Sequence, residues 1–144
     1  MEIKIAFALN SEEAFERRHF GDADQYHIYE LKDEAFQLIS KEKNPFRTAD
    51  ESTAHGQKSK ADQITRYLKD RGVSVLVSRQ FGRNIKFIVS NFIPVVIRKE
   101  SPEEVKKILL KHSRWVEEEL DRQPERYKLF TVDSGILKSK IEQR

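Results

Sequence analysis

The sequence predicts an α/β fold in which helices cover both faces of a mixed five-stranded sheet. Three observations carry this prediction: an alternating apolar segment at the start of the chain, helices with clear start signals, and short β-branched runs between them. Three strands come first, and helices then alternate with strands. We therefore expect the strand order 3-2-1-4-5 with strand 2 antiparallel, followed by a C-terminal β-hairpin extension.

The strands are predicted from side-chain alternation and turn residues. Residues 3–9 alternate large apolar side chains with alanines, which is typical of a central strand that packs on both faces. Residues 25–32 and 35–41 form an antiparallel pair around a polar turn. The last two strands of the sheet are the β-branched runs at residues 73–78 and 93–97.

The helices are predicted from their caps. Ser59 begins a helix that Gly72 ends, and residues 82–90 are long enough for a short helix. Ser101–Glu104 supplies an N-cap serine, a proline at the first position and a reciprocal glutamate, and the apolar stripe continues to Leu120. Accordingly, we predict a domain at residues 1–120 and a hairpin extension at residues 121–144.

Composition limits the chemistry. The formal net charge of +3 comes from 27 basic and 24 acidic residues, so there is no basic block that would indicate nucleic acid. The absence of cysteine excludes disulfides, thiolate nucleophiles and metal clusters held by the chain's own sulfur. No segment is apolar enough to span a membrane and the N-terminus lacks a signal-peptide pattern, so we expect a cytoplasmic protein.

The predicted topology brings three loops to one edge of the sheet, at the carboxyl ends of the first and fourth strands. These loops contain His19, His55 and the segment Phe81-Gly82-Arg83-Asn84. Ligands tend to bind at such a switch point, and a helix N-terminus there favours anions. A loop histidine is more often simply solvated, and a loop glycine more often serves a turn. This edge is nevertheless the one place where the sequence suggests a ligand-binding site.

A family resemblance rests first on His19-Phe20-Gly21-Asp22-Ala23, followed by Tyr26 and Ile28-Tyr29-Glu30. This segment resembles the HFG-x-A-x-x-F-x-I-Y-E segment of the dinitrogenase iron–molybdenum cofactor biosynthesis family. The resemblance covers roughly residues 1–110. Further elements agree in the same order: His55-Gly56, Gly72-Val73, the strand at 75–77, Gly82 with Asn84, and the strand at 93–95.

The resemblance implies a three-layer ribonuclease H-like motif and a non-catalytic function. The protein would bind or carry an iron–sulfur or iron–molybdenum cluster, or its precursor, in metallocofactor assembly, as nitrogenase accessory factors do. His19 or His55 would be the metal ligand, and Gly82, Arg83 and Asn84 would line the cofactor site. Donor and acceptor proteins of the cluster would be the partners. The extension beyond residue 114 is not part of the family pattern, which suggests an edge-strand or homodimer role for it.

The alternative function is a metal-free nucleic-acid or protein binding module on the same scaffold. A ribonuclease H-type activity is not expected, because two-metal chemistry needs carboxylates on the central strand and residues 3–9 contain none. The chain also lacks the common hydrolase and phosphate-loop motifs, so we expect no enzyme. The alternative rests on a basic rim around Phe20 and Phe81: Arg17, Arg18, Lys58, Lys60, Arg79 and Arg83.

Overall fold

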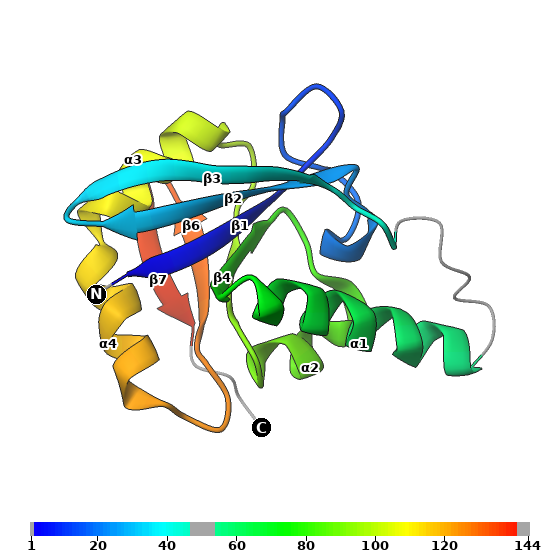
Figure 1. Cartoon of the computed structure of the whole chain (residues 1–144). Coiled ribbons are helices and arrows are strands. Elements are labelled where there is room, and N and C mark those ends of the chain that lie inside the picture. The colour runs from blue at the N-terminus through cyan, green and yellow to red at the C-terminus, as the bar shows by residue number, and fades with distance from the viewer. Residues whose placement is uncertain (1, 47–53, 141–144) are drawn as a thin grey trace.

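The computed structural model describes residues 2–46 and 54–140, which form one mixed sheet with helices on both faces (Figure 1). The strands are β1 (Ile3–Leu9), β2 (Gln25–Lys32), β3 (Ala35–Lys43), β4 (Val73–Ser78), β5 (Ile93–Val96), β6 (Leu129–Asp133) and β7 (Ile136–Lys140). Their order is β3-β2-β1-β4-β5-β6-β7. The pairs β1–β4, β4–β5 and β5–β6 are parallel, and the other three pairs are antiparallel.

The predicted five-stranded sheet is wrong in its strand number, because the sheet has seven strands. The order from β3 to β5 is as predicted, including the antiparallel β2. The C-terminal hairpin then joins the sheet, since β6 pairs with β5 through Val95–Phe130 and Val96–Thr131. This pairing covers the edge of β5, which would otherwise expose unpaired backbone groups. The predicted domain boundary at residue 120 is not tested and stays a prediction.

The helices differ from the predictions in two places. The helix predicted to begin at Ser59 begins at Ala54, and the stripe predicted to run on from Ser101 is broken at His112 (φ −113°, ψ 24°). The capping box at Ser101 is confirmed, since Glu104 N–H donates to Ser101 Oγ and Ser101 N–H donates to Glu104 Oε1. The helices are α1 (Ala54–Asp70), α2 (Ile85–Val89), α3 (Pro102–Lys111) and α4 (Ser113–Arg122), with the 3-10 helices η1 (Phe20–Asp22) and η2 (Gly82–Asn84).

Both faces of the central strand β1 are buried, as the alternation of its side chains predicts. On the first face, the large side chains of β1, such as Ile5 and Phe7, pack with residues of α3 and α4. On the second face, Ala6 and Ala8 pack with residues of α1 and α2. Figure 1 shows α1 and α2 on one side of the sheet and α3 and α4 on the other. None of the helices in the described part of the chain is long and apolar enough to cross a membrane.

The connections after β4 and β5 leave toward opposite faces. The segment from β4 to β5 passes through α2 on the second face, whereas the segment from β5 to β6 passes through α3 and α4 on the first. Both connections lead to the next parallel strand in the same direction along the sheet. Because they cross opposite faces, the two crossovers have opposite handedness. One of them therefore departs from the rule that crossovers between parallel strands are right-handed. The switch point is the place where neighbouring strands send their connections to opposite faces. The sequence predicts it between the first and fourth strands, but in the structure it lies between β4 and β5.

Shortening Leu137 tests whether the C-terminal hairpin is part of the folded core. Leu137 on β7 is fully buried against the first face, while its neighbour Ile136 is 44% exposed. We expect Leu137→Ala to lower the free energy of unfolding by about 2–5 kcal/mol in urea titrations, because it leaves a cavity. The control Ile136→Ala should change it by no more than about 0.5 kcal/mol. Equal and small effects of both variants would contradict the docking of the hairpin.

Candidate functional site

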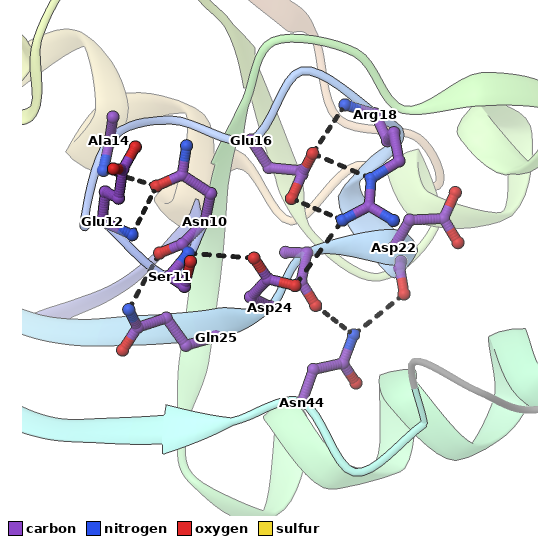
Figure 2. A network of polar contacts seen from close by, with 12 residues as sticks. Asn10, Ser11, Glu12, Ala14, Glu16, Arg18, Asp22, Asp24, Gln25 and Asn44 are labelled. Atoms are coloured by element: carbon purple, nitrogen blue, oxygen red, sulfur yellow. Dashed lines mark hydrogen bonds and ion pairs between the residues drawn. The ribbon is translucent and has the colours of Figure 1, made fainter.

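The loop that follows β1 begins with a turn built around Asn10. The side-chain Oδ1 of Asn10 accepts hydrogen bonds from the backbone N–H groups of Glu12 (2.9 Å) and Ala14 (3.0 Å) (Figure 2). Phe15 then forms an isolated bridge with Leu9 and buries its ring in the first-face core. Because the turn closes on itself, the polar segment after β1 returns to the edge of the sheet.

An ion pair between the buried Glu16 and the half-exposed Arg18 fixes the next part of this loop. The carboxylate of Glu16 is bound by two nitrogen atoms of the Arg18 guanidinium, at 2.9 and 3.0 Å, and Arg18 also lies 3.6 Å from Asp24 (Figure 2). The hydrogen bond from the Arg18 side chain holds the pKa of Glu16 below its usual value. Arg18 is thereby committed to the loop that carries His19, and its guanidinium is not available as a ligand group.

Asn44 holds the far side of the loop. Its Nδ2 atom donates to the carbonyl oxygens of Gly21 and Ala23, both at 2.9 Å (Figure 2). The same atom lies 3.2 Å from the Tyr26 hydroxyl. Tyr26 in turn donates to the carbonyl of Phe20 at 2.8 Å, and burial raises the pKa of its phenol. These bonds satisfy the buried polar groups around η1 and fix its backbone.

The loops after β1 and β4 are joined directly. Phe20 N–H donates to the Gln80 carbonyl at 2.9 Å, and the Phe20 ring stacks on Phe81 with 5.6 Å between the ring centroids. The Phe20 ring also stacks on Tyr26 at 4.8 Å. Phe20 and Phe81 are only 3% and 6% exposed. They therefore join the two loops as core residues and cannot stack on the bases of a nucleic acid.

His19 sits at this junction against Gly82. Gly82 has φ +75°, and a Cβ atom there would lie 2.7 Å from Nδ1 of the His19 ring and 2.9 Å from its Cε1. Only glycine fits both the backbone conformation and the close approach of the imidazole. The imidazole ring therefore packs closely against the backbone of Gly82, with Nδ1 as the nearest ring atom. His19 is exposed, and its imidazole makes no hydrogen bond to any residue that the structure describes.

The start of α1 is tied to the same loop. The buried ammonium group of Lys60 contacts Asp22 Oδ1 at 3.1 Å, and the Lys60 stem packs near Gly21. This pair lies just after the first turn of α1, which contains His55. The side chain of His55 lies outside the described residues, so its predicted role as a metal ligand stays a prediction.

The structure brings together two of the five predicted site residues by direct contact, His19 and Gly82. Arg83 follows in η2 and is exposed, and the side chain of Asn84 lies outside the described residues. Within residues 2–46 and 54–140, no group of three or more His, Asp or Glu side chains is placed to hold a metal ion. The site is thus an exposed imidazole on a fixed backbone, and not a cage of side chains.

Sequence reasoning missed two residues that position His19. Gln80 accepts from Phe20 through its carbonyl and donates through Nε2 to the carbonyl of Arg17 at 2.6 Å. Asn44 is the second of these residues, and it is buried although it lies beyond the end of β3. No periodic pattern marks either residue, because each acts through single hydrogen bonds to the backbone of a distant loop.

Replacing Gly82 by alanine tests the contact with His19, and Gly135 offers a matched control. Gly135 also has a positive φ (+79°), but a Cβ there meets nothing within 4 Å. We expect both alanine variants to lose about 1–2 kcal/mol of stability through the left-handed backbone. Only Gly82→Ala should also shift the imidazole resonances of His19 in NMR spectra. Unchanged His19 resonances in Gly82→Ala would contradict the contact.

Comparison with known proteins adds the family. The family model described as dinitrogenase iron-molybdenum cofactor matches residues 1–113, which include β1 to β5 and the helices α1, α2 and α3. The match thus includes His19 and Gly82 and leaves most of α4 and the final hairpin outside it. A search of curated proteins gave no match. Because the match covers well over half of the 144 residues, the chain belongs to the dinitrogenase iron–molybdenum cofactor family.

Proposed function

We propose that this protein is a non-catalytic carrier for an iron–sulfur or iron–molybdenum cluster, or its precursor, in metallocofactor assembly. The family supports a role in the biosynthesis of this cofactor. The observation that carries the proposal is the exposed imidazole of His19, which is held against Gly82 and has no hydrogen-bond partner among the described residues. The metal cluster is the cargo in this proposal, and His19 is its ligand.

The donor set of the chain suits such a cargo. Without cysteine, the chain offers imidazole nitrogen as a ligand, and a metal cluster that brings its own sulfide needs few ligands from the protein. The three ring atoms of His19 nearest to a Cβ at Gly82 are Nδ1, Cε1 and Cγ, so we assign the less crowded Nε2 to the metal. A single neutral imidazole gives ligation that exchanges readily, which is what delivery to an acceptor requires.

The surroundings of His19 favour a preformed site. The hydrogen bonds of Asn44, Gln80 and Phe20 fix the backbone on either side of the imidazole. Binding therefore does not have to order the loop, and less free energy is lost on association. Arg83 is exposed in the neighbouring loop and supplies a positive charge for an anionic metal cluster.

We also assign the five strands β1 to β5 and their helices to a ribonuclease H-like motif. The assignment rests on their order in the sheet, β3-β2-β1-β4-β5. The assignment concerns the fold alone. β1 carries no carboxylate, so the chemistry of metal-dependent nucleases has no support in its central strand.

The metal-free nucleic-acid module has less support. Its aromatic platform, Phe20 and Phe81, is buried in the second-face core. Two members of its basic rim serve the fold, since Arg18 binds Glu16 and Lys60 binds Asp22. Base stacking on exposed aromatic rings is a main source of affinity for single strands, and this site does not offer it.

The proposed partners are proteins that donate or accept the metal cluster. The C-terminal extension offers one surface for a partner or for a second copy of the chain. Trp115 on α4 and Ile136 on β7 are both 44% exposed, and β7 lies at one edge of the sheet. Edge strands and exposed apolar side chains are typical features of protein contacts.

Anaerobic titration with isolated iron–molybdenum cofactor tests the carrier function. We expect stoichiometric binding, followed by absorbance and EPR, and at least a tenfold loss of affinity in His19→Ala because the ligand nitrogen is removed. His112→Gln is the matched control, since His112 lies at the junction of α3 and α4 and stacks on Trp115.

His55→Ala is measured in parallel. Loss of binding in this variant alone would contradict the assignment to His19. Binding that is equally strong in all three variants would contradict histidine ligation, and no binding by the unaltered protein would contradict the carrier function.

A further inference from the structure

A large groove opens at the carboxyl ends of β4, β5 and β6, where the connections after β4 and β5 leave to opposite faces. Its volume is about 1100 Å³. Its polar lining consists of four cations, three carboxylates and two uncharged side chains: Arg17, Arg79, Arg98, Lys99, Glu100, Glu104, Asp133, Gln80 and Ser134. Open α/β sheets tend to bind ligands at such a division of their connections. Neither His19 nor the other residues assigned above to the metal cluster line this groove, which we call the basic groove.

Backbone hydrogen bonds bring the cations of the basic groove together. Ser78 pairs with Val96, and the Ile97 N–H donates to the Ser78 carbonyl at 3.0 Å, so the residues that follow β4 and β5 emerge side by side. Arg79 directly follows β4, and Arg98 follows Ile97 after the end of β5. Arg17 is drawn to the same place because its carbonyl accepts from Gln80 Nε2 at 2.6 Å.

The carboxylates at the groove are engaged in local structure. Glu100 Oε1 accepts from the backbone N–H groups of Arg98 and Lys99, at 2.9 and 3.2 Å. Glu104 accepts from the N–H of Ser101 in the cap of α3. The third carboxylate, Asp133, lies 3.4 Å from Lys138 on β7.

The cations of the groove are less engaged. The pKa of Glu104 is lowered mainly by its hydrogen bonds with Ser101, and that of Asp133 mainly by its hydrogen bond with Lys138. Lys99 and Arg98 add only weaker electrostatic contributions to these two shifts. The side chains of Arg17 and Arg79 make no hydrogen bond or ion pair to any residue in the described part of the chain. Two guanidinium groups thus lie beside this groove with no partner among residues 2–46 and 54–140.

The floor of the basic groove is apolar. It is formed by Val96, Ile97, Ile108 and Val132. A hollow of this size with an apolar floor and a few polar groups at the rim is typical of sites for organic molecules, whereas a lone inorganic ion needs far less room. Guanidinium groups match carboxylate and phosphate oxygens through paired hydrogen bonds.

We propose that the basic groove binds a small organic polyanion that carries carboxylate or phosphate groups. Arg17 and Arg79 bind its oxygen atoms, Arg98 and Lys99 add positive charge, and its carbon skeleton lies on the apolar floor. This site is separate from the ligation of the metal cluster by His19, and it does not depend on the carrier function. It adjoins that site through the chain, since Arg17 precedes His19 by two residues.

Calorimetric titration of the full chain with citrate and, separately, with ATP at constant ionic strength tests this proposal. We expect saturable one-to-one binding of at least one probe, and at least a tenfold loss of affinity in Arg79→Gln and in Arg17→Gln. Arg79→Lys keeps the charge but loses the planar fork, so it should also weaken binding. If citrate alone binds, the groove is a polycarboxylate site, and if ATP alone binds, it is a phosphate site. Binding of both probes identifies a site that accepts either group.

Two control variants separate this site from overall charge and from the metal cluster site. Arg114→Gln removes the same charge beyond the other end of α3 and should leave affinity unchanged. His19→Ala should also leave citrate and ATP binding unchanged, so failure of the carrier function would not affect this result. Absence of saturable binding of both probes, or equal weakening by Arg114→Gln and Arg79→Gln, would overturn the proposal.

Discussion

The hydrogen bond from Phe20 N–H to the Gln80 carbonyl, with the stacked rings of Phe20 and Phe81, is the contact on which the candidate site depends. β1 and β4 are parallel neighbours, so the loops that follow them emerge at the same edge of the sheet. The loop after β1 is polar and long, and it needs an anchor to hold one conformation. This contact supplies the anchor and places the imidazole of His19 against Gly82.

Neighbouring cations in this region have different roles. Arg18 is bound by the buried Glu16, whereas the guanidinium of Arg17 has no partner among the described residues and lines the basic groove. In the same way Lys60 is buried against Asp22, while Arg83 is exposed. The net charge of the chain is small, so its charge alone does not show where anions bind. The pairing of individual basic side chains shows which of them are available to bind an anion.

The sequence predicts the parts of the fold that rest on local rules. The alternation in residues 3–9 predicts a strand buried on both faces, and the capping box at Ser101 predicts the start of α3. Gly72 follows α1 and has φ +75°, and its position after the apolar stripe predicts that the helix ends there. The motif at His19 identifies the family, which the matched span of residues 1–113 confirms.

The remaining features depend on contacts between distant segments. The pairing of β6 with β5 is decided by which edge the hairpin reaches, and turn residues alone do not contain that information. The basic groove exists because α3 and α4 cross the opposite face from α2, so its position could not follow from a uniform rule of handedness. Asn44 is a third example, because its side chain is fixed by carbonyl groups of a loop far away in sequence.

We propose that the imidazole of His19 coordinates the metal cluster, and pulsed EPR of the loaded protein can detect this coordination. Protein labelled with ¹⁵N-histidine and loaded anaerobically with isolated iron–molybdenum cofactor should show a ¹⁵N hyperfine coupling to the paramagnetic cluster. That coupling should vanish in His19→Ala protein loaded to the same extent. A spectrum without histidine nitrogen coupling, or a coupling that persists in His19→Ala, would contradict the account.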